Sequence, residues 1–264
     1  ISACLVGSEM CIRDRSGRLS KIDSDGYVDR AYSDLKSYFI QGAYTNGSTL
    51  IKAISFGGHE KTYQAWDGLS MDQVMENRRQ NPLTYENEID NYKQDHFQLH
   101  WNEKINNYWS FNLGLNYTDG RGYFEQYKED DDINTYGGIV KSDIDSNGNE
   151  TGTTDLIRRR WLDNDFYVLN SSINYIKDKI DLTLSSSYSS YVGDHYGEVI
   201  WARSLSNTGE IRDRYYEGLG EKKDLSFFAK LLYSINKKTE LYTDIQFRGV
   251  KSVSYTHLRA HETG

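Results

Sequence analysis

The sequence predicts an all-β protein: a segment of an antiparallel, up-and-down transmembrane β-barrel, with about eight strands that belong to a larger barrel. Three observations support this fold class. The chain has 22 tyrosines, 22 glycines and one proline in 264 residues, a composition typical of many strands. Apolar and polar residues alternate in several segments, which is the period of a strand with two different faces. The connections between these segments are alternately short and long, as in outer-membrane barrels.

Composition and charge exclude some classes of function. The formal net charge of −8 argues against a nucleic-acid partner, which needs a basic patch. The sequence has no run of about 18 apolar residues, so it predicts no transmembrane helix. The mean hydropathy of −0.75 is compatible with both a water-soluble protein and a membrane barrel, because a barrel strand is apolar only at alternate residues.

The two ends of the chain are related to each other at the level of DNA. Residues from Asp14 back to Cys4 pair with residues from Val253 on to Thr263, and each pair can be encoded by reverse-complementary codons. Such a run is an inverted repeat read in frame. It resembles the two translations of a transposase sequencing adapter.

We therefore predict that residues 1–15 and 252–264 are non-native, adapter-derived segments, and that residues 16–251 are the native part. Both cysteines, Cys4 and Cys11, lie in the first of these segments. The native part has no cysteine, which leaves its redox compartment open.

The first native residues, Ser16–Arg30, are polar and are expected to be the end of a loop. Two segments that resemble strands follow, at about 35–45 and 48–58. Between them stands Asn46-Gly47, the dipeptide that suits a type I′ hairpin turn because both residues accept positive φ. The sequence therefore predicts a first hairpin here.

A long polar segment, His59–Tyr92, separates this hairpin from the next. Within it, Leu69–Arg79 has the composition of a short helix, with Ser70 near its start as the capping residue. We expect this segment to be a long loop.

The clearest strand pattern lies between Asp95 and Tyr117. Two arms alternate apolar and polar residues around the polar turn EKINN, residues 103–107. The apolar face of this hairpin is expected to contact lipid, through Phe97, Leu99, Trp101, Trp109, Phe111, Leu113 and Leu115. The polar face is expected to line the lumen, through Gln98, His100, Asn112 and Asn116.

The second half of the chain repeats this arrangement. Long polar segments are expected at about 119–160 and 194–223, and they precede two further hairpins. The strands of these hairpins are expected at about 166–176, 179–193, 225–235 and 240–250. Aromatic residues near strand ends fit the girdles at the two membrane interfaces, namely Trp101, Trp109, Tyr175 and Tyr188.

The alternation of connections favours a membrane over water as the solvent of the apolar face. Hairpin loops in soluble sandwiches usually have about two to five residues, so three loops of about 30 to 40 residues are unusual there. Outer-membrane barrels combine short periplasmic turns with long external loops. The strands, at roughly 10 to 15 residues, also reach the length of about 9 to 11 that spans a bilayer.

The segment GGHEKTYQAWDGL, Gly57–Leu69, resembles the sequence that follows a barrel hairpin in TonB-dependent outer-membrane receptors of Bacteroidetes-like bacteria. The resemblance implies a larger barrel closed around an N-terminal plug domain, in the outer membrane of a Gram-negative bacterium. It also implies import of a scarce ligand, such as a ferric siderophore, haem, cobalamin or a glycan, driven by a TonB-type energy-transducing protein. Neither the plug nor the energy-coupling motif is visible in this sequence.

Aromatic and arginine side chains in the long segments are the candidate ligand-binding residues. Aromatic rings stack on sugars or on the rings of a siderophore, and guanidinium groups bind anions. Packing within the loops explains each of these residues equally well. The candidates are Tyr63, Trp66, Arg121, Tyr123, Phe124, Tyr127, Trp201 and Arg203.

Metal and catalytic signals are weak. The segment at Asp143, Asp145 and Asn147 starts like a calcium loop, but Thr154 stands where the closing bidentate acid belongs. We therefore expect no metal, no cofactor and no enzyme, because no spacing sets a nucleophile beside a base. His96 and His100 are expected to line the lumen.

Two other functions are compatible with the residues. A secreted or surface carbohydrate-binding β-sandwich would use the same loop aromatics as a sugar platform. An outer-membrane enzyme would need serine, histidine and an acid facing one another. The sandwich and the barrel differ in whether a second sheet covers the apolar face.

Overall fold

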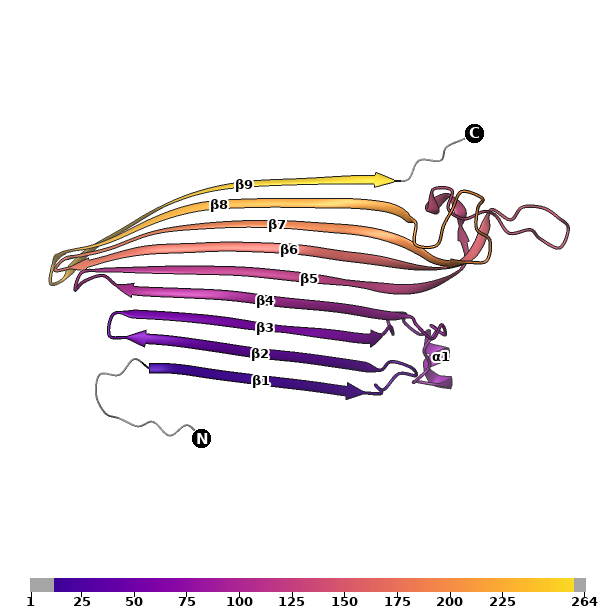
Figure 1. Cartoon of the computed structure of the whole chain (residues 1–264), viewed down its shortest axis with the longest axis horizontal. Coiled ribbons are helices and arrows are strands. Elements are labelled where there is room, and N and C mark those ends of the chain that lie inside the picture. The colour runs from indigo at the N-terminus through magenta and orange to yellow at the C-terminus, as the bar shows by residue number, and fades with distance from the viewer. Residues whose placement is uncertain (1–11, 259–264) are drawn as a thin grey trace.

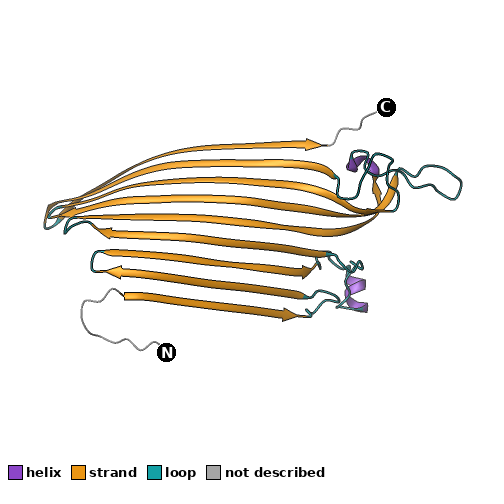
Figure 2. Cartoon of the chain, in the orientation of Figure 1, coloured by secondary structure: helices purple, strands orange, loops and turns teal. Residues whose placement is uncertain are grey.

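The computed structural model describes residues 12–258 and contains one antiparallel sheet (Figures 1 and 2). A short helix and a 3-10 turn lie among the connections. The strands of the sheet are β1 (Ile12–Ser24), β2 (Ser33–Asn46), β3 (Thr49–Tyr63), β4 (Ile89–Lys104), β5 (Trp109–Asp132), β6 (Thr153–Lys177), β7 (Ile180–Ala202), β8 (Arg214–Asn236) and β9 (Thr239–Leu258). The helical elements are α1 (Met71–Glu76) and η1 (Ile133–Tyr136).

The nine strands lie side by side in sequence order, so the predicted up-and-down antiparallel fold is confirmed. The turns after β2, β4, β6 and β8 are short and lie together at one end of the sheet, on the left in Figure 1. The longer connections, which include α1, lie at the other end. Among residues 12–258 no second sheet packs on this one, so the described part is not a two-layer sandwich.

The sequence prediction of a loop at Ser16–Arg30 is wrong for residues 16–24 and right for residues 25–30, which lie in the connection to β2. Residues 16–24 contribute most of β1, which pairs with β2 from Ile12 opposite Thr45 to Ser24 opposite Ser33. Edge strands form through backbone hydrogen bonds and do not require an alternating apolar pattern, and Leu19 is 85% exposed. The prediction of about eight strands therefore becomes nine.

The long connections exist but are shorter than predicted, because the strands extend beyond their apolar parts. They span residues 64–88, 133–152 and 203–213, which we call the first, second and third long connections. β5 has 24 residues and β6 has 25, against 14 in β2. At about 3.3 Å per residue, β6 is roughly 80 Å long, far more than a bilayer requires.

The short turns form where predicted, although the first has a different geometry. Asn46 and Gly47 do not adopt the positive φ of a type I′ turn. Instead the Asn46 Oδ1 atom accepts hydrogen bonds from the amides of Ser48 and Thr49, at 3.4 and 3.0 Å. An asparagine side chain that substitutes for a backbone acceptor stabilises a turn without positive φ.

The predicted short helix is confirmed as α1. Ser70 is its N-cap and forms a capping box with Gln73. The Ser70 hydroxyl accepts the Gln73 amide at 3.3 Å, and the Gln73 side chain accepts the Ser70 amide at 2.8 Å. Two otherwise unpaired amides are thereby satisfied. None of the helices among the described residues is long and apolar enough to cross a membrane.

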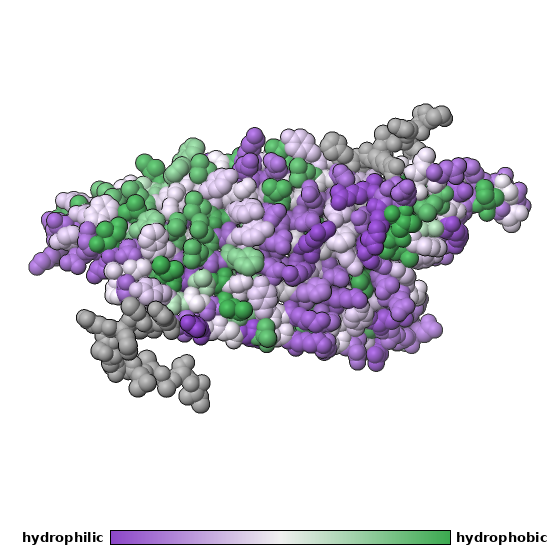
Figure 3. Space-filling view, in the orientation of Figure 1, coloured by the Kyte–Doolittle hydropathy of each residue, from purple (hydrophilic) through white to green (hydrophobic). Residues whose placement is uncertain are grey.

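One face of the sheet carries a band of uncovered apolar side chains near the short turns. Leu99 lies opposite Leu115, which lies opposite Leu169 on the next strand. Leu99 and Leu115 are each 39% exposed. Figure 3 shows hydrophobic residues gathered over the half of the molecule nearer the short turns, and mostly hydrophilic ones over the other half. We call the apolar side chains of this face the apolar band; on β5 the band runs from Trp109 to Tyr117.

The opposite face of the same strands is polar. Gln98 lies opposite Asn116, and Asn102 lies opposite Asn112. A shallow depression on this face is lined mainly by small polar residues, including His100, Asn170, Ser172, Ser185 and Ser187. The alternation read from the sequence therefore separates the two faces as expected.

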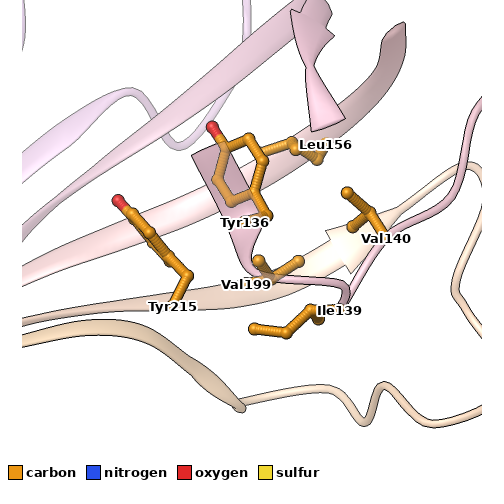
Figure 4. Close-up of a cluster of buried hydrophobic side chains, with 6 residues drawn as sticks. All are labelled: Tyr136, Ile139, Val140, Leu156, Val199 and Tyr215. Carbon is orange, nitrogen blue, oxygen red and sulfur yellow. The ribbon is translucent and has the colours of Figure 1, made fainter. Parts of the chain in front are cut away.

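The buried hydrophobic cluster of the described residues lies at the end with the long connections (Figure 4). Tyr136 and Leu156 are fully buried, and Tyr136 packs edge-on against Tyr215 with ring centroids 4.8 Å apart. The cluster joins the second long connection to the starts of β6 and β8 and the end of β7. Its members are Tyr136, Ile139, Val140, Leu156, Val199 and Tyr215.

The described parts of the predicted adapter-derived segments lie in the two edge strands. Residues 12–15 begin β1 and residues 252–258 end β9. Cys4 and Cys11 lie outside the described residues. The prediction that these segments are non-native stays a prediction.

Candidate ligand-binding site

Six of the eight predicted ligand-binding residues lie on strands rather than in loops. Tyr63 ends β3, Trp201 lies near the end of β7, and four residues lie in the extended part of β5. Trp66 lies in the first long connection and Arg203 in the third. The four on β5 are Arg121, Tyr123, Phe124 and Tyr127.

The structure brings these residues together in three separate groups. Trp66 packs edge-on against Phe124, with ring centroids 5.8 Å apart. Arg121 and Tyr123 both contact Trp161 on β6: the guanidinium of Arg121 lies 5.3 Å from one Trp161 ring centroid, and the Tyr123 ring 4.6 Å away. Arg121 and Tyr123 lie on the same side of β5 as the apolar band, whereas Phe124 lies on the polar side.

Two of the eight residues stand apart. Tyr63 is 5% exposed, and its hydroxyl donates to the carbonyl oxygens of Leu83 and Tyr85, at 3.0 and 2.7 Å. It therefore anchors the first long connection rather than presenting a ring at the surface. Trp201 is 44% exposed and lies opposite Ile157 on β6.

The third group joins Tyr127 and Arg203 through the buried carboxylate of Asp155. The Tyr127 hydroxyl donates to Asp155 at 2.7 Å, the Asp130 amide donates at 3.0 Å, and Arg203 forms an ion pair with it. Burial alone would raise the pKa of Asp155, but these three partners outweigh burial and lower it. The hydrogen bond to Asp155 raises the pKa of Tyr127 to about 12.

This network predicts an acid-sensitive connection. Because the folded pKa of Asp155 lies below its unfolded value, its contribution is full above about pH 4 and is lost as the pH falls further. Asp155→Asn is expected to cost about 1–3 kcal/mol of local stability at pH 7, since it weakens buried hydrogen bonds, and to reduce this acid dependence. Amide hydrogen exchange of residues 203–213 measures both effects.

The matched control for Asp155→Asn is Glu150→Gln, in the exposed tip of the second long connection. Glu150→Gln removes the same charge without touching the network. If both variants opened residues 203–213 equally, the network would not be what holds them.

The residues of the weak calcium candidate make other contacts. Asp143 accepts hydrogen bonds from Thr154 at 3.0 Å and from Ser204 at 2.6 Å, and it pairs with Arg203 at 3.2 Å. Asp145 accepts the amide of Asn147 at 2.8 Å at the tip of the connection. Among the described residues no group of three or more His, Cys, Asp or Glu side chains is placed to hold a metal ion.

The two histidines on the polar face are also engaged. His96 stacks on Phe56 with ring centroids 4.4 Å apart and hydrogen-bonds Thr118 at 2.9 Å. His100 contacts Gln98 at 3.2 Å. Both histidines are thus bound into the polar side of the sheet.

The sequence prediction missed an arginine that faces a cleft on the polar side. The Arg160 guanidinium lies 5.6 Å from the Phe124 ring centroid and 5.5 Å from that of Tyr216, and its Nε atom donates to the Tyr216 hydroxyl at 3.2 Å. No carboxylate of the described residues lies within ion-pair distance of it. The cleft is also lined by Glu60, Asp90, Tyr92, Leu162 and His195.

This cleft combines the properties of a binding site. Two aromatic rings hold the guanidinium in place and leave part of it exposed, and Trp66 adds a third ring beside Phe124. The rings and the guanidinium suit a ligand that carries rings and an anionic group, and Glu60 and Asp90 can accept hydrogen bonds from its donor groups. The sequence did contain a signal for this site. Residues 158–160 are all arginine, and Arg158 and Arg160 share one face because residues two apart on a strand do so.

Comparison with known proteins supports the fold. No family model and no curated protein sequence matches the chain. Among solved structures, the ferric-catecholate import receptor Fiu from E. coli K12, in its closed form, matches with a TM-score of 0.61 at 10% identity, over 92% of this chain and 39% of that one. The ferric yersiniabactin uptake receptor FyuA from Yersinia pestis matches with a TM-score of 0.55 at 10% identity, over 94% and 36%.

The ferric preacinetobactin receptor BauA from Acinetobacter baumannii is similar too, with a TM-score of 0.52 at 6% identity, over 91% of this chain and 37% of BauA. The chain therefore spans about two fifths of the length of these receptors. At such low identity, the likeness is one of fold.

Proposed function

We propose that this chain is part of the barrel of a TonB-dependent outer-membrane receptor, which binds a scarce ligand such as a ferric siderophore and imports it without covalent chemistry. The apolar band carries this proposal. Along β5 the band runs from Trp109 to Tyr117, nine residues that span about 26 Å at roughly 3.3 Å per step. Strands of such barrels tilt by about 35–45°, so this length gives a height of roughly 20 Å, close to the outward apolar band of about 25 Å.

The edges of the band support a membrane position. Near the short turns, Trp109 packs against Tyr175 with ring centroids 4.6 Å apart, as aromatic residues do at an interface. At the other edge, Tyr117 stacks on Tyr167 at 4.7 Å. The next row on the same face is acidic, with Asp95 opposite Asp119 and Asp119 opposite Asp165.

The rest of the proposal concerns parts of the receptor outside this chain. A plug domain would close the lumen, and a TonB-type protein would supply energy through it, in the outer membrane of a Bacteroidetes-like bacterium. The ligand would meet the long connections first and then the cleft at Arg160. The similar structures are receptors for iron complexes, which favours a ferric siderophore as the ligand.

The test begins with the complete gene that contains residues 16–251. Expressed in a Gram-negative host that lacks its own siderophore receptors, the product is expected in the outer-membrane fraction. We expect it to restore growth on at least one ferric siderophore when iron is limiting, and only when the host's TonB-type protein is present. Recovery of the protein in the soluble fraction would contradict the proposal and favour the carbohydrate-binding alternative.

A further inference from the structure

Two buried polar atoms beside the Arg160 cleft have no hydrogen-bond partner. They are the Nε atom of Arg158, on β6, and the hydroxyl oxygen of Tyr215, on β8. Tyr215 is 5% exposed and belongs to the buried cluster of Figure 4. Buried polar groups are nearly always paired, so two unpaired ones in one place indicate a partner that is not protein.

The unpaired atoms belong to one connected group of side chains. Arg158 donates through Nη1 to the Tyr136 hydroxyl at 3.1 Å, and the Tyr136 and Tyr215 ring centroids are 4.8 Å apart. Tyr215 in turn packs edge-on against Tyr216 at 5.0 Å, and Tyr216 accepts the hydrogen bond from Arg160. Tyr216 therefore connects Arg160, which lines the cleft, to the buried Tyr215.

Two guanidinium groups and one directly paired carboxylate belong to this group. Asp131 lies 3.7 Å from Arg158 and also accepts the Tyr136 hydroxyl, so one carboxylate is shared between them. Arg160 forms no ion pair among the described residues, and Glu60 and Asp90 line the same cleft. Burial raises the pKa of Tyr215 to about 12 although both arginines oppose that shift, so its hydroxyl is a neutral donor at physiological pH.

We propose that Arg158, Arg160 and Tyr215 form a binding site for an oxyanion group, carboxylate or phosphate, of the imported ligand. An oxyanion accepts several hydrogen bonds at once, and the guanidinium fork matches its geometry. It would pair both buried donors and supply Arg160 with the ion pair that it lacks among the described residues. Phe124 and Tyr216 would flank the organic part of the ligand. This inference rests on the proposed receptor function and narrows the ligand to an anionic one.

The test uses the complete receptor purified in detergent, with inorganic phosphate and benzoate as probes. Line broadening in phosphorus NMR follows phosphate, and saturation transfer follows the ring of benzoate. We expect Arg160→Gln and Tyr215→Phe each to weaken binding of at least one probe by about tenfold, the size of effect of one charge-assisted hydrogen bond. Loss of phosphate binding alone assigns a phosphate group, and loss of benzoate binding alone assigns a carboxylate.

A matched pair of variants separates binding from folding. Tyr215→Phe removes a hydroxyl that has no protein partner, so the melting temperature without probe is expected to stay the same or rise. Tyr136→Phe removes a hydroxyl that is paired with both Asp131 and Arg158, so it is expected to lower the melting temperature.

Two results would overturn the oxyanion site. One is probe binding that neither Arg160→Gln nor Tyr215→Phe weakens. The other is a loss of stability in Tyr215→Phe as large as in Tyr136→Phe. Either result leaves outer-membrane location and siderophore-dependent growth unaffected, so failure of this site is distinguishable from failure of the receptor function.

Discussion

Replacing Leu115 with arginine is expected to lower the stability of the assembled barrel by about 2 kcal/mol, the lower end of the cost of a charged side chain at the middle of a lipid-facing surface. Leu115 lies inside the apolar band, two residues from its Tyr117 edge, between Leu99 and Leu169 on the neighbouring strands. It is partly exposed because no protein covers it, so lipid is its proposed solvent. Urea titration of the complete receptor folded into lipid vesicles measures the loss.

The neighbouring residue provides the control. Asn116 lies one residue further along β5 and therefore faces the polar side, opposite Gln98. Asn116→Arg adds the same charge at the same depth on that side, and we expect an effect below about 1 kcal/mol. Equal losses in Leu115→Arg and Asn116→Arg would show that the apolar band does not contact lipid.

The contrast between these two positions was available from the sequence, because strand alternation is a local property. Every residue from Trp109 to Tyr117 follows the same period of two, and the register places Leu113 opposite Trp101 as the pattern requires. The turns were also predictable from the sequence, because they depend on contacts between residues close in the chain. Side-chain acceptors such as Asn46 and Asn106 bind amides within three residues of themselves.

The sequence did not predict that the strands extend beyond the apolar band. In the outer part of β5 and β6, the cross-strand pairs include a charged one, Glu125 with Arg159, and an aromatic one, Tyr123 with Trp161. Both faces of this region carry polar or aromatic groups, so no apolar period marks it. Cross-strand contacts stabilise such strands, and these depend on a register that only the folded sheet defines.

In the candidate site, too, some features could be predicted from the sequence and others could not. That Arg158 and Arg160 share a face follows from their spacing. The contact between Tyr127 and Arg203 does not, because the two residues lie on different elements and meet only through Asp155. The missing partners of Arg158 and Tyr215 likewise become visible only when the surroundings of each side chain are known.

Replacing Leu156 with alanine is expected to cost about 2–5 kcal/mol, the range for removing a large side chain from a packed core. Leu156 is fully buried near the start of β6, in the cluster with Ile139 and Val199. The cluster is separate from the apolar band, so we expect the loss to appear as local opening. Amide hydrogen exchange is expected to accelerate in residues 133–152 and 203–213.

Leu169→Ala makes the same change further along β6, in the apolar band, where the side chain is 38% exposed. It is expected to leave exchange in the two connections unchanged. The strands between Trp109 and Tyr117 are expected to keep their protection in both variants, because hydrogen bonds across the sheet hold them independently of the cluster. If Leu156→Ala unfolded these strands as well, the long connections and the sheet would form one cooperative unit. Local opening instead would leave the Arg160 cleft, which borders the cluster through Tyr216, free to change shape when a ligand binds.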